Sequence, residues 1–277
     1  DERARFVDFA VDLYRASAQC VPPLRRDAMG ILDKDKHPFY EHSVADYFVV
    51  ESGGKVLGRV AALENRNFNG FHGSKTAFFG YFESVDDAEV ARALLSTVEQ
   101  WARERGLDSV VGPRGVVGID GSILVEGFEH RPALTMPWNY PYYEPLILTN
   151  GYEPEATYLS GYARGDHPLP PRLYEIAAKV KAQRGYWVKT FASRGELREW
   201  IPRALEIHRQ AMSGLHSFYP PTERESRAFV NTLLTIIDPS LIKVVMKGDD
   251  VAGFIIAYHD VSAGLQKASG RLFSFGW

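Results

Sequence analysis

Two stretches of the 277-residue chain share one pattern: YFVVESGGKVLGRVAAL at 47–63 and IKVVMKGDDVAGFIIAY at 242–258. Each runs from an apolar segment through a polar turn containing glycine to Val-x-Gly and a second apolar segment. Val56-Leu57-Gly58 aligns with Val251-Ala252-Gly253 at an offset of 195 residues. Short β-rich segments separated by a glycine turn are typical of antiparallel hairpins. The pattern predicts one supersecondary unit used twice, although two hairpins with ordinary turns can also look alike by chance.

The segments before each hairpin support the repeat. Residues 3–16 are expected to form a helix with an apolar face, because their apolar residues recur at helical spacing. Before the second hairpin, helices are expected at 194–212 and at 223–237. Pro202 falls inside the first of these and is expected to kink or restart it. Each half of the chain therefore opens with helix, loop and hairpin.

The chain after the first hairpin alternates strands and helices. The clearest helix is predicted at 86–105, which has a long apolar stripe and ends at Gly106. In order, we expect a strand at 76–84 with both faces covered, this helix, a strand at 109–112, a glycine-rich loop at 112–127, an aromatic segment at 136–143, a helix ending at Asn150 and a strand at 157–162.

The composition is that of an ordinary soluble globular chain, 45% apolar and 24% charged. A net charge of −3 lacks the basic surplus typical of nucleic-acid binders. No apolar run approaches the roughly 18–20 residues that span a bilayer. Cys20 alone cannot form an internal disulfide, and the scattered histidines predict no zinc or other metal site. We expect a cytoplasmic protein that acts on a small molecule, with no metal, nucleic-acid or membrane partner; the oligomeric state is left open.

This order of elements resembles the acyltransferases of the GNAT (N-acetyltransferase) superfamily. The stretch from Tyr143 to Tyr152, YEPLILTNGY, resembles that superfamily's motif B, a helix that carries Tyr and ends at Gly-Tyr before the last strand. Four further segments are similar to a group of bacterial tandem GNAT-like proteins. They are Pro38-Phe39-Tyr40, Gly58-Arg59-Val60-Ala61-Ala62, Phe79-Gly80-Tyr81-Phe82-Glu83 and Met136-Pro137-Trp138-Asn139-Tyr140-Pro141-Tyr142-Tyr143. The resemblance covers essentially the whole chain.

The resemblance implies an α/β (α+β) fold, with a mixed, mostly antiparallel sheet flanked by helices. It implies one complete domain at 1–166 with an insertion at 112–141, a linker or helix at 167–185, and a partial second domain at 186–277. Only 24 residues follow Gly253, whereas the first copy needs about a hundred after Gly58. We therefore expect the chain to be a fragment of a longer protein.

The activity implied by the resemblance is transfer of an acyl group from acyl-CoA (acetyl-CoA) to an amine or a similar small-molecule acceptor. Tyr142 and Tyr143 then become candidates for the acid, since motif B contributes it, and Glu83 becomes a candidate base. The alternative for the two tyrosines is that they only pack in a Pro-rich turn. The alternative for Glu83 is a helix-capping or surface carboxylate near the positive end of a helix.

One departure from the superfamily concerns the cofactor. Active members hold the pyrophosphate of acyl-CoA on a glycine-containing loop at a helix N-terminus. The corresponding turn here, 83–88, contains no glycine and carries three carboxylates, Glu83, Asp86 and Asp87, which repel an anion. One rival is therefore a non-catalytic, degenerate GNAT domain that binds a ligand or partner. A second rival, the aminoacyl-tRNA-using tandem transferases, would be expected to show more basic surface.

The glycine-rich loop supplies further candidates. Arg114 and Asp120 are candidate ligand contacts, although the loop lacks the Lys-Ser/Thr ending of a nucleotide P-loop. His130 and Asn139 border the same insertion and are also candidates for substrate binding. The alternative for each of these last two is a structural role, because single polar residues beside aromatics usually satisfy nearby backbone groups.

Overall fold

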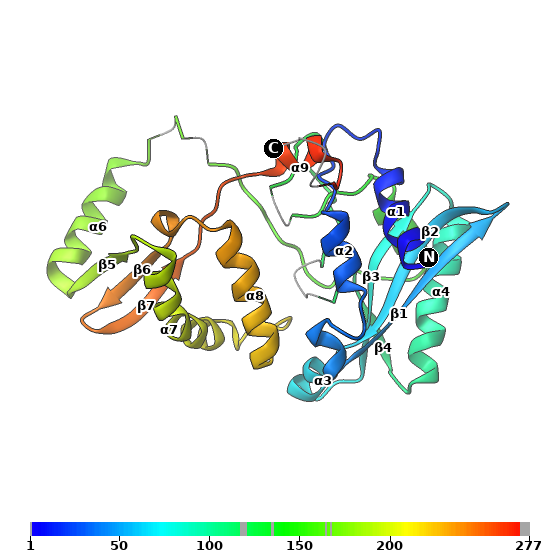
Figure 1. The fold of residues 1–277 in the computed structure, drawn as a ribbon, viewed down its shortest axis with the longest axis horizontal. Coiled ribbons are helices and arrows are strands. Elements are labelled where there is room, and N and C mark those ends of the chain that lie inside the picture. Colours follow the sequence, from blue (N-terminus) through cyan, green and yellow to red (C-terminus); the bar gives the residue numbers. More distant parts are fainter. Residues whose placement is uncertain (1, 117–120, 134–135, 164, 167, 272–277) are drawn as a thin grey trace. The chain divides into compact units, whose positions relative to one another are not determined.

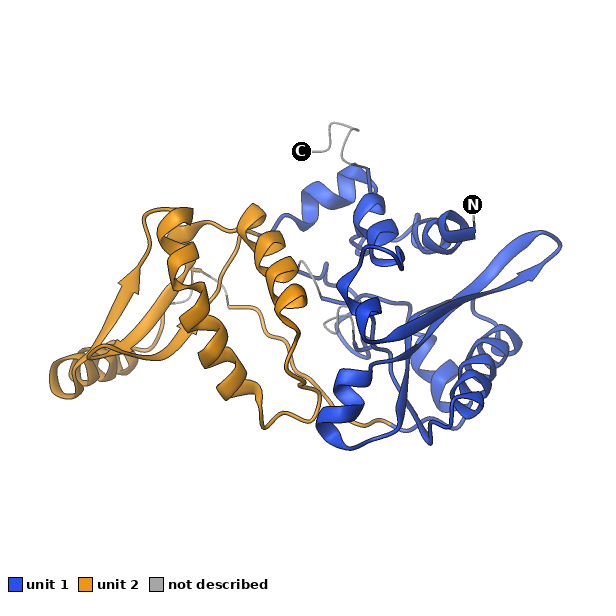
Figure 2. Ribbon diagram, turned by 60° about the horizontal axis from the view of Figure 1, so that its bottom comes forward, with its two compact units in different colours: residues 1–153, 260–277 blue, residues 154–259 orange. Residues whose placement is uncertain are grey.

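The structure, a computed structural model, describes residues 2–116, 121–133, 136–163, 165–166 and 168–271 (Figure 1). The chain divides into two compact units: unit 1 comprises 1–153 with 260–277, and unit 2 comprises 154–259 (Figure 2). The sequence resemblance places the boundary at 166 and the segment 260–277 in the second half. In the structure, this segment returns to unit 1: it includes α9 (Ser262–Ala268), where Gln266 Nε2 donates to the Cys20 carbonyl at 3.0 Å.

Unit 1 is built on a four-stranded mixed sheet in the order β1-β2-β3-β4. The strands are β1 (Val44–Ser52), β2 (Lys55–Glu64), β3 (Thr76–Ser84) and β4 (Ser109–Val111). The first three are antiparallel, and β4 pairs parallel to β3. Nearly every residue of β3 is buried, as expected for a strand covered on both faces. The predicted fold class, a mostly antiparallel mixed sheet flanked by helices, is confirmed.

Helices cover both faces of this sheet. The helix α4 (Ala88–Glu104) crosses from β3 to β4 and buries the stripe that the sequence predicts, including Val90, Leu94 and Val98. The opposite face carries α1 (Glu2–Leu13) and α2 (Arg25–Ile31) (Figure 1). The unit also contains the 3₁₀ helix η1 (Pro38–Glu41), α3 (Arg66–His72) and α5 (Tyr143–Leu148). Gly106, with φ +68°, follows α4 and ends it as predicted.

Unit 2 repeats the opening of unit 1. It contains α6 (Pro171–Arg184), β5 (Tyr186–Thr190), α7 (Arg194–Met212), α8 (Glu223–Ile236), the 3₁₀ helix η2 (Pro239–Leu241), β6 (Lys243–Lys247) and β7 (Asp250–Ile255). Its three strands form an antiparallel sheet in the order β5-β6-β7. Two helices, a 3₁₀ turn and a hairpin therefore follow one another in both units.

The two hairpins agree in the position of their bulge. In unit 1, Val50 pairs with Gly58 and the next residue pairs with Val56, which leaves Leu57 as the extra residue. In unit 2, Val245 pairs with Gly253 and the next residue pairs with Val251, which leaves Ala252 extra. The shared Val-x-Gly is therefore one bulge built twice, and the predicted repeat is confirmed.

One secondary-structure prediction is wrong. Residues 157–162 form no strand; Leu159 is 97% exposed, and no described strand lies beside the segment to complete a ladder. The helix expected at 194–212 is confirmed as α7, and it continues through Pro202 without restarting. No helix within the described residues is both long and apolar enough to cross a membrane.

Candidate functional site

The end of β3 positions a carboxylate that the sequence singled out. Arg59 of β2 pairs with Glu83, but Ala61 pairs with Gly80, so β3 carries one extra residue between these pairs. The bulge includes Tyr81, whose φ of +51° is unusual for a residue with a side chain. Because a bulge shifts the direction of the side chains that follow it, Glu83 lies directly opposite Arg59.

Glu83 lies in a hydrogen-bonded group that we call the Glu83 network: Glu83, Arg59, Tyr14 and Tyr143. The Tyr143 hydroxyl lies 2.6 Å from Glu83 Oε2, and the Tyr14 hydroxyl contacts the same oxygen. The two hydroxyls are 2.8 Å apart. Arg59 Nη2 lies 3.6 Å from Glu83 Oε1 and completes an ion pair. The residue directly after α1, the β2-β3 pair and α5 therefore converge on one carboxylate, although they are distant in sequence.

Burial controls the protonation of this network. Desolvation raises the pKa of Glu83 above its ordinary value, although Arg59 and the two tyrosine hydroxyls oppose the shift. Burial and the charge of Glu83 raise the pKa of both Tyr14 and Tyr143. The tyrosines therefore remain protonated donors at neutral pH. Glu83 becomes a stronger proton acceptor than an exposed carboxylate.

Arg59 is itself held by neighbouring backbone and rings. Its Nη1 donates to the carbonyl of Phe6 at 2.9 Å, and its guanidinium lies 4.8 Å from the centre of the Phe6 ring. Its Nε has no hydrogen-bond partner among the described residues. The guanidinium thus links α1 to the network, and the ion pair with Glu83 offsets part of the cost of burying both charges.

Aromatic side chains pack beside the network. Tyr14 lies 5.7 Å from Trp138 and 5.2 Å from Tyr140 between ring centres. Tyr140 stacks on Tyr142 at 5.3 Å, and the Tyr142 hydroxyl donates to the carbonyl of Ser84 at 2.9 Å. We call Trp138, Tyr140 and Tyr142 the aromatic wall. All three are partly exposed, so the wall offers a rigid apolar surface.

Cys20 packs beside this cluster. Burial, with a smaller contribution from the charge of Glu83, raises the pKa of its thiol to about 12. The thiol therefore stays protonated at neutral pH. This agrees with the absence of an adjacent basic residue in the sequence, and Cys20 is not a nucleophile in this state.

The turn between β3 and α4 does not fit the pyrophosphate of acyl-CoA. Asp87 is the N-cap of α4, and its carboxylate accepts from the amides of Glu89 at 2.8 Å and Val90 at 3.4 Å. Those amides are the donors that would otherwise hold a phosphate. The helix N-terminus is therefore satisfied by its own carboxylate.

The other predicted site residues that the structure describes have partners of their own. Arg114 places its guanidinium 4.9 Å from the Phe68 ring. His130 is exposed and lies 3.2 Å from Glu129. Asn139 is buried, and its amide bonds to the backbone of Leu124 and Tyr140, which is the structural role that the sequence left open. Asp120 lies outside the described residues.

Two members of the network were missed by sequence reasoning. Arg59 could have been found, since it is a charged residue inside the otherwise apolar strand 56–63. Tyr14 extends the apolar face of α1 by one turn from Ala10, but nothing in its spacing indicates a carboxylate partner.

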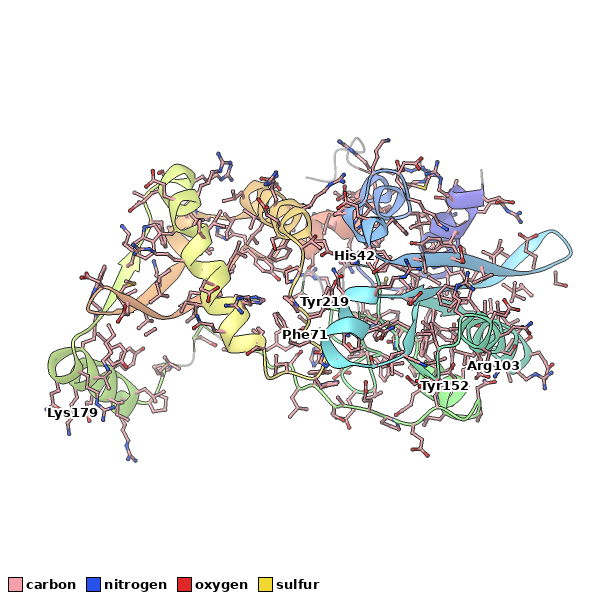
Figure 3. All side chains as sticks on the ribbon, turned by 90° about the horizontal axis from the view of Figure 1, so that it is seen from below. His42, Phe71, Arg103, Tyr152, Lys179 and Tyr219 are labelled. Carbon is pink, nitrogen blue, oxygen red and sulfur yellow. The ribbon has the colours of Figure 1, made fainter. Side chains whose placement is uncertain are left out.

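One hollow of unit 1 lies at the C-terminal end of α4. It measures about 460 Å³ and is lined by residues at the C-terminal end of α4, the start of β4 and the segment after α5, among them Arg103 and Tyr152 (Figure 3). Glu83 precedes the opposite end of α4. None of the network residues lines the hollow. The hollow and the Glu83 network are therefore separate sites.

Comparisons with known proteins match nearly the whole chain. No family model matches it. Protein YghO of Escherichia coli is 24% identical over 98% of this chain and 69% of its own length. A bacterial ceramide synthase of Caulobacter vibrioides is 25% identical over 100% of this chain and 72% of its own length. Among solved structures, a tandem GNAT protein from the clavulanic acid biosynthesis pathway, without AcCoA, is 16% identical with a TM-score of 0.48, covering 92% of this chain and 70% of that one.

The order of elements agrees with the resemblance as far as α5, and the strand expected after it is not formed. Unit 1 runs hairpin, strand, α4, parallel strand, α5, as the sequence resemblance predicts, and unit 2 repeats its helix-helix-hairpin opening. The fold is GNAT-like in its order of elements.

Proposed function

We propose that the chain is an N-acyltransferase that transfers an acyl group from acyl-CoA to the amine of a lipid-like acceptor. The Glu83 network carries the proposal, because it places a buried carboxylate of raised pKa beside a partly exposed aromatic wall. Two further observations support it: the GNAT-like order of elements, and an alignment over the whole of this chain with 72% of a protein described as a bacterial ceramide synthase. The amine and lipid character of the acceptor follow that relative.

Glu83 serves as the base in this proposal. An aliphatic amine is protonated at neutral pH and must lose a proton before its nitrogen can attack an acyl carbon. Glu83 accepts that proton, and 16% of its side chain is exposed. Tyr143 is only 1% exposed and bonds to Glu83, so we assign it, with Tyr14, to positioning the carboxylate. Tyr142, in the aromatic wall, is the tyrosine that a substrate can reach.

The acyl donor is not held at the start of α4, since Asp87 occupies those amides. The phosphates of the donor must therefore bind other residues. Glu83 and its partners act on the acceptor amine: the neutral nitrogen then attacks the acyl carbon, the C–S bond of the thioester breaks, and the departing thiolate of coenzyme A takes the second proton of the nitrogen.

The test compares Glu83→Gln with Glu89→Gln, a change at an exposed carboxylate of α4. The whole chain is incubated with acetyl- and long-chain acyl-CoA and a panel of amines that includes long-chain amino alcohols, and amide products are measured by mass spectrometry. We expect Glu83→Gln to lower kcat/KM by about 100-fold or more, because a positioned general base contributes that much. Glu89→Gln is expected to behave as wild type.

Circular dichroism verifies that both variants are folded. Turnover by wild type should rise with pH through the raised pKa of Glu83, and Glu83→Gln should lose this dependence. Unchanged turnover in Glu83→Gln would remove Glu83 from the mechanism, and absence of product with every donor and amine would contradict the activity itself.

A non-catalytic binding module is the second candidate, and the self-capped N-terminus of α4 favours it. Thermal shifts separate the two. A ligand of the native state raises the melting temperature whether or not it reacts. Stabilisation by an amine without stabilisation by any acyl-CoA, and without product, supports the binding module.

A further inference from the structure

The helix α6 leaves an unusual amount of apolar surface open to solvent. None of its 14 residues is buried. Leu173 and Ile176 are about half exposed, and Tyr174 is 60% exposed. In Figure 1, α6 stands beside β5 at one edge of unit 2. Exposed apolar patches of this kind mark surfaces that contact a partner or a membrane.

Four apolar residues of α6 share one side of the helix. Leu173, Ile176, Ala177 and Val180 follow the i, i+3, i+4, i+7 spacing and form one apolar stripe. At 3.6 residues per turn, Arg172 and Lys179 lie on one side of the stripe and Lys181 on the other, while Arg184 lies in line with the stripe at the C-terminal end of the helix. Lys179 points outward from the helix (Figure 3).

The charge of α6 is opposite to that of the chain. Its four cations face a single acid, Glu175, which gives a net charge of +3, whereas the whole chain carries −3. Another helix of unit 2, α8, offers a contrast. It also exposes apolar residues, Phe229 and Ile236, but its two Arg and two Glu cancel. Apolar exposure and a cationic surplus therefore coincide only on α6 of these two helices.

This combination favours one class of partner. A coiled-coil partner would need an apolar seam sustained over three or four heptads, and this stripe covers two turns. A helix that lies in a membrane interface has an apolar face that enters the acyl boundary, and cations beside it that bind anionic headgroups. Long Lys and Arg side chains can reach those headgroups while their stems stay among apolar groups.

We propose that α6 docks unit 2 on an anionic lipid surface, with the Leu173–Val180 stripe inserted and the flanking cations on lipid phosphates. The sequence expectation of no membrane partner rested on the lack of a spanning segment, which a helix lying on the surface does not need. The proposal does not depend on the acyl transfer proposed above, because its readout is binding alone.

The first experiment is co-sedimentation of the whole chain with vesicles. We expect binding to vesicles of phosphatidylglycerol mixed with phosphatidylcholine, and at least about tenfold weaker binding to phosphatidylcholine alone. Raising the salt from about 0.1 M to about 1 M shortens the screening length from about 10 Å to about 3 Å, so it should release most of the bound protein.

Paired variants separate the two contributions. Leu173→Ser with Ile176→Ser should weaken binding to anionic vesicles about tenfold or more, since it removes the inserting side chains. Lys179→Ala with Lys181→Ala should have a similar effect and should also flatten the salt dependence. The matched control is Phe229→Ser with Ile236→Ser on α8, which should bind as wild type. Thermal melting verifies that all three remain folded.

Three outcomes would overturn the proposal. One is the absence of wild-type binding to anionic vesicles. Another is loss of binding in the α8 control to the same extent as in the α6 variants. The third is light scattering that shows a dimer, without lipid, which the Leu173→Ser and Ile176→Ser pair dissociates; the stripe would then be covered by a second copy of the chain.

Discussion

The two units build the same bulged hairpin and use it differently. In unit 1, a Cβ placed at Gly58 would lie 2.8 Å from both Leu94 and Val90, because α4 packs on this position. In unit 2, a Cβ at the equivalent Gly253 would meet no atom of the described residues within 4 Å. The next position differs in chemistry as well, Arg59 in unit 1 and Phe254 in unit 2. One backbone motif thus supports a charged network in one unit and a small apolar core in the other.

The largest expected effect comes from giving unit 1 an apolar residue at this position. Arg59→Met should lower the free energy of unfolding by about 3 kcal/mol at neutral pH, because it leaves Glu83 buried without its cation. The effect should be measured by urea unfolding between pH 4 and pH 8. Phe254→Met in unit 2 is the control, since this substitution leaves no buried charge without an ion-pair partner.

The pH dependence of that loss has a definite sign. Arg59 lowers the pKa of Glu83, so its removal moves the pKa further above the ordinary 4.5. A raised pKa in the folded state gives stability that is present at low pH and is lost as the pH rises through that pKa. The difference between Arg59→Met and wild type should therefore be smallest near pH 4 and grow toward neutrality. A difference that stays constant over this range would contradict the ion pair.

The paired glycines provide the second comparison. Gly58→Ala should destabilise unit 1 by about 1–3 kcal/mol, because the new methyl group overlaps packed side chains of α4 and approaches the Glu83 carbonyl. Gly253→Ala should change stability by less than about 0.5 kcal/mol, since its Cβ meets open space. Hydrogen exchange followed separately in each unit measures both. Equal losses in the two variants would show that the shared glycine serves the bulge rather than the packing of a helix.

The smallest expected effect concerns the helix caps. Asp87→Ala removes the cap of α4 and should cost about 1 kcal/mol, as should Thr222→Ala, which removes half of the capping box of α8. Asp87→Asn keeps an acceptor and should cost less than Asp87→Ala. The melting temperature and local hydrogen exchange report these losses. If Asp87→Ala instead raised the melting temperature, the Asp87 carboxylate would be destabilising at this turn, and its hydrogen bonds to the α4 amides would not stabilise the helix.

The elements with a strong local signal could be predicted from the sequence. The helices at 86–105 and 194–212 carry an apolar periodicity, and the hairpins carry a glycine turn, so their positions follow from neighbouring residues alone. The strand predicted at 157–162 has the residue types of a strand but no partner to pair with, which only the tertiary structure decides.

The candidate site was less accessible to prediction. Glu83 and Tyr143 were singled out, but their contact depends on the bulge at Tyr81, and a register shift of one residue turns a side chain to the other face. Tyr14 lies directly after α1 and is 69 residues from Glu83 in sequence. The spacing of neighbouring residues predicts neither the strand register nor the packing of the helices. The network could therefore be described only from the folded chain.

The return of residues 260–271 to unit 1 has a mechanical consequence. The backbone leaves unit 1 after Glu153 and comes back at Asp260, where Gln266 clasps the carbonyls of residues 18–20 and the Arg25 amide bonds to Gly270. Unit 2 is therefore an insertion whose two ends both connect to unit 1. A single protease cut in the exposed stretch 154–163 would not release unit 2, because the fragment after the cut stays bound to the N-terminal fragment through the contacts of α9.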